Sequence, residues 1–128
     1  SPATRVIACE PETGAPLAAS FAAGEPRTVD YRASFVDGAG SKALLPAMWE
    51  RARPLLAGAV SVSLRDTAAA VRQLATRARV VAEGAGGLAL AAALAGHGGE
   101  GRVVCIVSGG NIDAATLAAI LQGVTPGE

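Results

Sequence analysis

The clearest structural signal in the chain is the stretch Val103-Val104-Cys105-Ile106-Val107-Ser108-Gly109-Gly110-Asn111-Ile112-Asp113. Its first five residues are apolar and mostly β-branched, which predicts a buried strand. A small polar turn follows at 108–111, and Asp113 is suited to cap a helix that begins directly after it. A strand that ends in such a turn marks the carboxyl edge of a parallel sheet, where open α/β folds bind their ligands. We therefore expect a small molecule to meet the chain at this turn.

Working outward, short apolar runs alternate with helical patterns along the chain. The expected strands lie at 5–9, 59–62 and 103–107, and the expected helices at 15–23, 44–56, 64–78, 88–95 and from 114 onward. Ser63 is a good N-cap for the third of these helices, with Asp66 in the acidic position of a capping box. The pattern predicts an α/β fold with three layers, in which helices cover both faces of a mainly parallel sheet. At 128 residues, the chain fits one domain, residues 1–128.

Composition excludes several classes of function. The 11 basic and 11 acidic residues balance and are spread along the chain, which argues against a nucleic-acid-binding face. No apolar run approaches the roughly 20 residues of a membrane-spanning helix, so we expect no membrane partner. Cys9 and Cys105 each lie in an apolar run, and we interpret them as free thiols of a cytoplasmic protein.

The turn at 108–111 is the best candidate for a ligand site. Its glycines let a flat ligand approach the backbone, and the following helix would present unpaired N–H groups and a partial positive field. Ser108 adds a hydroxyl that can donate or accept a hydrogen bond. An ordinary strand-to-helix turn explains the same residues, and the residues alone leave both interpretations open.

Glu83 in Glu83-Gly84-Ala85-Gly86-Gly87 is the second candidate. A lone carboxylate among small residues at a helix start can handle a proton or orient a ligand. It can equally be a helix-entry acid beside packing glycines. The motif lacks the spacing of a dinucleotide-binding fingerprint, and no acidic residue follows about 20 positions later, which excludes that class of site.

Other reactive side chains are weaker candidates. Lys42 is the only lysine and lies in an open loop pattern, which favours a solvated residue over a Schiff-base amine. His97 is the only histidine, and no second metal-ligating residue lies near it in the sequence. Glu10 and Glu12 can contact a cation, although a solvated strand end is the favoured interpretation.

Four segments in order resemble a known family. They are 6–12 (Val-Ile-Ala-Cys-Glu-Pro-Glu), 35–38 (Phe-Val-Asp-Gly), 81–86 (Val-Ala-Glu-Gly-Ala-Gly) and 107–113 (Val-Ser-Gly-Gly-Asn-Ile-Asp). Together they resemble the carboxyl-terminal part of threonine dehydratases and serine racemases, which are pyridoxal-phosphate enzymes of the tryptophan-synthase-β-like fold (fold type II). The resemblance covers essentially the whole chain.

The resemblance implies a role for each motif. Ser108 would hydrogen-bond the pyridine nitrogen of pyridoxal 5'-phosphate, with Gly109 beside it in the cofactor-binding turn. Glu83 would line the pocket as a catalytic wall residue, and Gly38 would approach the cofactor ring. Some members bind a divalent cation beside the Glu-Pro segment, which implies a metal ligand at Glu10.

The resemblance also implies what lies outside this chain. In this family the Schiff-base lysine and the Gly-rich phosphate cup come earlier in the sequence, so the chain is expected to be a carboxyl-terminal fragment that partners the missing amino-terminal part. The parent would convert threonine to 2-oxobutanoate and ammonia, and the fragment alone would be inactive. The alternatives are a serine racemase fragment and a small non-enzymatic anion-binding module. Exposed apolar edges predict self-association.

Overall fold

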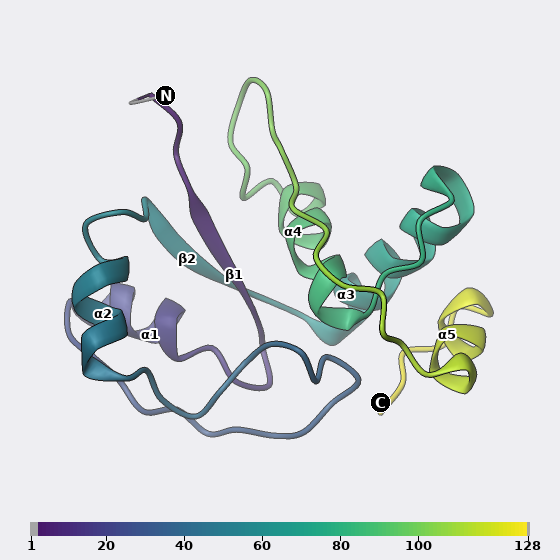
Figure 1. Ribbon diagram of the computed structural model, residues 1–128, viewed down its shortest axis with the longest axis horizontal. Helices are drawn as coiled ribbons and strands as arrows, with labels where there is room; N and C mark the ends of the chain where they lie inside the picture. Colours follow the sequence, from purple (N-terminus) through teal and green to yellow (C-terminus); the bar gives the residue numbers. More distant parts are fainter. Residues whose placement is uncertain (1–2, 128) are drawn as a thin grey trace.

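The computed structural model describes residues 3–127, and Figure 1 shows a small parallel sheet with helices on both sides. The elements in chain order are β1 (Ile7–Pro11), α1 (Pro16–Ala23), α2 (Pro46–Ala52), β2 (Gly58–Val62), α3 (Leu64–Gln73), the π-helical turn η1 (Leu74–Ala78), α4 (Gly84–Leu94) and α5 (Ala114–Leu121). The α/β class predicted from the sequence is confirmed.

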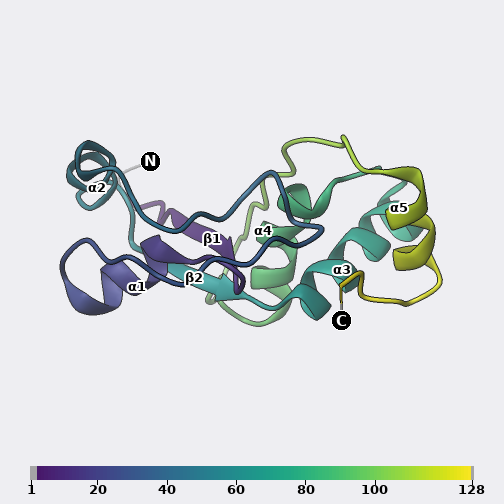
Figure 2. The same ribbon diagram turned by 90° about the horizontal axis from the view of Figure 1, so that it is seen from below.

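The sheet is a parallel pair, with β1 beside β2 and Ile7 opposite Gly58 in the register. Successive side chains of a strand point to opposite faces. Cys9 and Val60 pack against the core cluster that includes residues of α4, while Glu10 reaches the start of α1. Helices α1 and α4 contact both strands and lie on opposite sides of them in Figures 1 and 2, which gives the helix–sheet–helix order of layers.

The main core lies between the sheet, α3 and α4, and is built from small side chains. Leu64 and Leu88 are almost fully buried, and the buried alanines of α4, Ala91 and Ala92, pack beside them. Such a close approach of α3 and α4 needs small residues at the contact. A Cβ atom added at Gly87 would lie only 2.7 Å from Val71 Cγ2.

Both helix N-caps predicted from the sequence are confirmed. The Ser63 hydroxyl accepts a hydrogen bond from the Asp66 amide at 3.0 Å, which starts α3. The Asp113 carboxylate accepts one from the Thr116 amide at 3.0 Å, which starts α5. The position of α5 against the core is fixed mainly by Ile120, which is 1% exposed.

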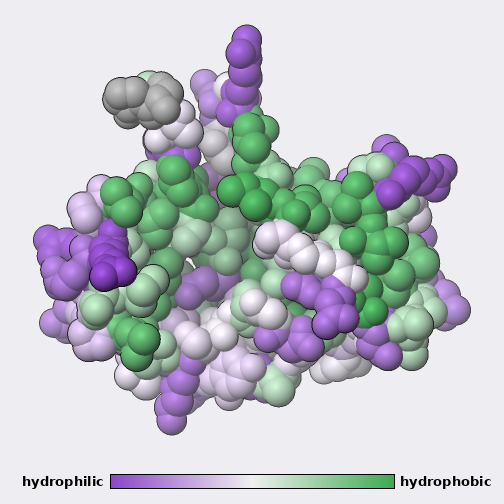
Figure 3. All heavy atoms as spheres, viewed as in Figure 1, coloured by the Kyte–Doolittle hydropathy of each residue, from purple (hydrophilic) through white to green (hydrophobic). Residues whose placement is uncertain are grey.

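The prediction of a buried strand at 103–107 is wrong for the described residues. The segment is extended but belongs to no sheet, and Val104 and Ile106 are 88% and 75% exposed. An apolar β-branched run becomes a buried strand only when neighbouring strands satisfy its backbone groups and helices cover its side chains. Residues 3–127 provide no strand beside it, and Figure 3 shows hydrophobic atoms gathered on this face.

Among residues 3–127, no helix combines the length and the apolar character needed to cross a bilayer.

Candidate cofactor site

Three of the residues singled out in the sequence converge at one place. Gly38 lies in the loop before α2, Glu83 directly precedes α4, and Gly109 lies in the turn before α5. A Cβ atom added at Gly109 would lie 2.5 Å from Glu83 Oε1, and one added at Gly38 would lie 3.0 Å from the same oxygen. The two glycines therefore flank the Glu83 carboxylate, although 45 and 26 positions separate them from it in the chain.

Backbone contacts hold this arrangement together. The Glu83 amide donates a hydrogen bond to the Gly109 carbonyl at 3.2 Å, which ties the entry of α4 to the turn. Gly109 has φ +98°, a conformation that glycine adopts without strain. A Cβ atom at Gly86 would lie 2.9 Å from the Gly109 carbonyl oxygen, so the first turn of α4 needs glycine there as well.

The Glu83 carboxylate has no hydrogen-bond donor among the described residues. Glu83 is the N-cap of α4, yet its side chain makes no cap hydrogen bond, and the residue is only half-buried. A carboxylate in this state keeps its full capacity to accept a proton or a hydrogen bond from a ligand. The geometry therefore favours a ligand-facing role over a helix-capping role for Glu83.

Ser108 is exposed, and its hydroxyl makes no hydrogen bond within the part of the chain that the structure describes. Its backbone lies against the start of α4, since a Cβ atom at Gly86 would be 3.4 Å from the Ser108 carbonyl oxygen. The backbone of Ser108 is thus fixed beside the cluster of Gly38, Glu83 and Gly109, while its hydroxyl is available to a ligand. The amino terminus of α5 is occupied by the Asp113 carboxylate, which opposes a second anion at that position.

Glu10, which the resemblance implied as a metal ligand, caps a helix instead. Its two carboxylate oxygens accept hydrogen bonds from the amides of Leu17 at 3.1 Å and Ala18 at 2.8 Å, in the first turn of α1. Glu12 acts in the same way toward α3, accepting from the Leu64 amide at 2.8 Å. The two carboxylates of this strand end therefore neither coordinate together nor remain solvated.

The described residues do not fit a divalent cation at Glu10. Residues 3–127 contain no group of three His, Cys, Asp or Glu side chains that could hold a metal ion. A Ca²⁺ or Mg²⁺ site needs several oxygen ligands around one point, and both oxygens of Glu10 already accept helix amides. We therefore derive no role for a cation from this structure.

The Glu10 carboxyl gives the fold a predicted pH dependence. Burial raises the pKa of Glu10, and the two backbone hydrogen bonds from Ala18 and Leu17 only partly oppose this. The folded protein thus holds this proton more tightly than the unfolded chain, so the contribution is full at low pH and is lost as pH rises through the folded pKa. Relative to Glu10→Gln, wild-type stability should fall between about pH 4 and about pH 7.

The measurement is urea unfolding of wild type and Glu10→Gln at several pH values. Only the slope of the difference between the two proteins tests the prediction, because the variant also loses one acceptor oxygen at every pH. A difference that stays flat or rises with pH would contradict the raised pKa of Glu10.

Comparison with known proteins identifies what this site serves. The family described as "Pyridoxal-phosphate dependent enzyme" matches residues 1–109. The chain belongs to this family. As a pyridoxal-phosphate-dependent enzyme chain, it is 35% identical over 124 residues to the catabolic L-threonine dehydratase of Escherichia coli (strain K12), covering 94% of this chain and 38% of that protein.

Solved structures give the same assignment. A threonine deaminase from the organism abbreviated T.th. matches with a TM-score of 0.76 and 30% identity, over 88% of this chain and 42% of that one. Maize serine racemase matches with a TM-score of 0.80 and 28% identity, over 95% of this chain and 40% of that one. The chain spans between 28% and 38% of the length of the curated relatives that it matches.

The residues of the site fit the cofactor of the family. A planar ring needs a surface without bulky side chains, and both Gly38 and Gly109 lack the Cβ atom that would fill the space beside Glu83. The exposed Ser108 hydroxyl is a neutral partner for a ring nitrogen. Neither Lys42, which is exposed in the loop before α2, nor any other lysine lies in this cluster.

Sequence reasoning missed the contacts that hold the site in place. The Glu83-to-Gly109 hydrogen bond and the close approach of Gly86 to the turn join segments that are more than 20 positions apart. The only signal for them was the glycine content of 84–87, which indicated close packing but not its partner.

Proposed function

We propose that this chain forms the ring-facing wall of the cofactor pocket in a pyridoxal-phosphate-dependent lyase that acts on a β-hydroxy amino acid. In the parent enzyme, threonine would be converted to 2-oxobutanoate and ammonia. The observation that carries the proposal is the convergence of Gly38 and Gly109 on the free Glu83 carboxylate, beside the exposed Ser108. The relatives named threonine dehydratase and threonine deaminase support this substrate class.

Each residue has a distinct part in this proposal. When bound, pyridoxal phosphate supplies the electron-withdrawing ring on which loss of the β-hydroxyl depends. Ser108 would hydrogen-bond the ring nitrogen without holding a full proton there, as a carboxylate would. Gly109 and Gly38 would leave the ring room to lie flat. Glu83 would line the pocket and hold or release a proton at its wall.

The reactive amine and the phosphate cradle would come from the remainder of the enzyme. Lys42 lies outside the cluster, so nothing near Ser108 supplies an amine within residues 3–127. We therefore expect the isolated chain to be inactive and to act only with an amino-terminal partner portion. A cytoplasmic setting is part of the proposal, supported by the free thiols Cys9 and Cys105.

A chimera tests the proposal. This chain would replace the matched region of the Escherichia coli threonine dehydratase, and the purified chimera would be assayed with pyridoxal phosphate and L-threonine. Release of 2-oxobutanoate by the chimera, and none by the isolated chain, is the expected result. A folded chimera that binds pyridoxal phosphate but deaminates neither threonine nor serine would contradict the proposal.

The second candidate is a serine racemase portion, which the maize neighbour favours. Both reactions would use the same wall, so the products decide. Formation of D-serine from L-serine by the chimera, in excess of pyruvate, would assign it to a racemase. The non-enzymatic anion-binding module is less well supported, because Asp113 already occupies the start of α5.

Self-association of the isolated chain is a separate prediction. Val104 and Ile106 are 88% and 75% exposed on an unpaired extended segment, and such edges pair with other chains. The double variant Val104→Lys/Ile106→Lys should shift sedimentation toward the monomer at concentrations where wild type associates. Leu55→Lys is the matched control, because Leu55 is 74% exposed but lies on the loop before β2. Equal association of all three proteins would contradict the prediction.

A further inference from the structure

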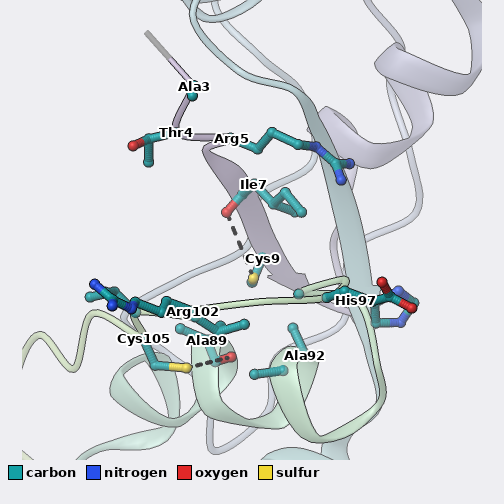
Figure 4. A pocket seen from close by; sticks show the side chains of 15 residues that line it. Ala3, Thr4, Arg5, Ile7, Cys9, Ala89, Ala92, His97, Arg102 and Cys105 are labelled. Carbon is teal, nitrogen blue, oxygen red and sulfur yellow. Dashed lines mark hydrogen bonds between the residues drawn. The ribbon is translucent and has the colours of Figure 1, made fainter. Parts of the chain in front are cut away.

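A groove separate from the cofactor site runs between β1 and the extended segment 102–105. Its volume is about 360 Å³. Figure 4 shows Ile7 and Cys9 of β1 on one side, Cys105 on the other, and Ala89 and Ala92 of α4 forming the floor. We call this hollow the edge groove. Its walls come from opposite ends of the chain, and it takes no part in the cluster around Glu83.

The β1 wall of the edge groove has free backbone groups. Residues of a parallel strand turn their N–H and C=O groups alternately to the two neighbours. The Val6 carbonyl accepts from the Ala57 amide at 2.8 Å, and the Glu12 amide donates to the Val62 carbonyl at 2.8 Å, so the even-numbered residues face β2. The backbone groups of Ile7 and Cys9 therefore face the groove. The Ile7 carbonyl has only a weak contact there, from Cys9 Sγ at 3.9 Å.

The opposite wall and the floor are also suited to an extended segment. Residues 102–105 are extended and outside any sheet, and Figure 1 shows the segment running in the same direction as β1. The floor presents only small side chains, those of Ala89, Ala92 and Ala93. Burial, and after it the nearby Cys105 thiol, raises the pKa of Cys9, which places both sulfur atoms on this shared space.

We infer that the edge groove receives a β-strand from the remainder of the parent enzyme, which pairs with β1 on one side and with segment 102–107 on the other. The inference rests on the proposed function, because it names the element by which the partner portion docks. The chain spans 28–38% of its curated relatives, so a polypeptide long enough to supply this strand exists in them. Main-chain pairing along an open edge is an established mode of association.

The groove also specifies the chemistry of its occupant. The strand runs parallel to β1, since both of its neighbours run in one direction, and it bonds the backbone of Ile7 and Cys9. Its side chains that face α4 are small and apolar, because the alanine floor brings the helix close. Docking would cover Val103 and Cys105, and it would turn 103–107 into the buried strand that its sequence pattern indicates.

Hydrogen exchange on the isolated chain tests the open edge first. The amides of Ile7 and Cys9 should exchange at least 10-fold faster than those of Ala8 and Glu10, which face β2. The measurement is made at the lowest concentration at which the chain is monomeric. Equal protection of the odd and even amides in the monomer would show that the edge is already closed, and would overturn the inference.

Thiol alkylation then tests the occupant. Iodoacetamide should modify Cys9 and Cys105 in the isolated chain and at least 10-fold more slowly in the chimera with the Escherichia coli remainder, both without added pyridoxal phosphate. Ala22→Cys, an exposed position on α1, is the control whose reactivity should not change. Docking without lyase activity would leave the inference standing and the proposed function wrong. Equal reactivity in a folded chimera, or protection that appears only when isolated chains self-associate, would overturn the inference.

Discussion

The variant Gly84→Ala should lose most of the stability of this fold. A Cβ atom at Gly84 would lie 2.8 Å from the Phe35 carbonyl oxygen and 2.9 Å from Val36 Cα, and neither backbone atom can rotate away. Alanine in a helix is about 1 kcal/mol better than glycine, which works in the opposite direction. We expect the overlap to prevail and to cost about 3 kcal/mol, because Val36 is 2% exposed and fixed in the core.

Urea unfolding followed by the fluorescence of Trp49, which is 3% exposed, measures this loss. Gly101→Ala is the control: Gly101 has φ +96° and its added Cβ would meet no atom within 4 Å, so only backbone strain of about 1 kcal/mol is expected. A Gly84→Ala protein as stable as wild type would show that the loop at 35–36 does not lie against α4.

The variant Gly109→Ala should damage the site far more than the fold. Its Cβ atom would lie 2.5 Å from Glu83 Oε1 and 2.9 Å from Glu83 Cδ, so the carboxylate must leave its place between Gly109 and Gly38. A side-chain end moves at little cost, so the stability loss should be close to that from strain alone, about 1 kcal/mol. In the chimera, the affinity for pyridoxal phosphate should fall by at least about 10-fold, because about 1.4 kcal/mol of lost contact is enough.

Gly101→Ala is again the matched control, since Gly101 and Gly109 have nearly the same φ, +96° and +98°. The two variants should be about equally stable by urea unfolding, while only Gly109→Ala loses cofactor affinity in absorbance titrations. Equal affinity for the cofactor in both variants would remove Gly109 from the proposed pocket wall.

Local signals in the sequence predicted much of the fold. The caps at Ser63 and Asp113 were predictable because a short polar side chain bonds amides only three residues away. The parallel α/β class was predictable from apolar runs alternating with helical patterns. The break near Arg79, which follows η1 with φ +60°, was not predicted, because no glycine or proline marks it.

The candidate site was predicted residue by residue through its resemblance to a family, and only partly through physical chemistry. Glycines and a lone carboxylate at Glu83 indicated a small-residue site, yet nothing in the local pattern paired Glu83 with Gly38 or Gly109. Glu10 shows the opposite case: a carboxylate at a strand end matched a cation ligand equally well, and only the position of α1 made it a helix cap.

The sequence by itself determined the class of fold, the helix caps and the intrinsic tendency of 103–107 to form a strand, because these depend on residues a few positions apart. Tertiary structure alone decided whether that tendency was realised. A strand needs hydrogen-bonded neighbours, and within residues 3–127 the backbone of 103–107 has none, so Val104 and Ile106 remain exposed. The same dependence on distant segments placed Gly38, Glu83 and Gly109 at one point.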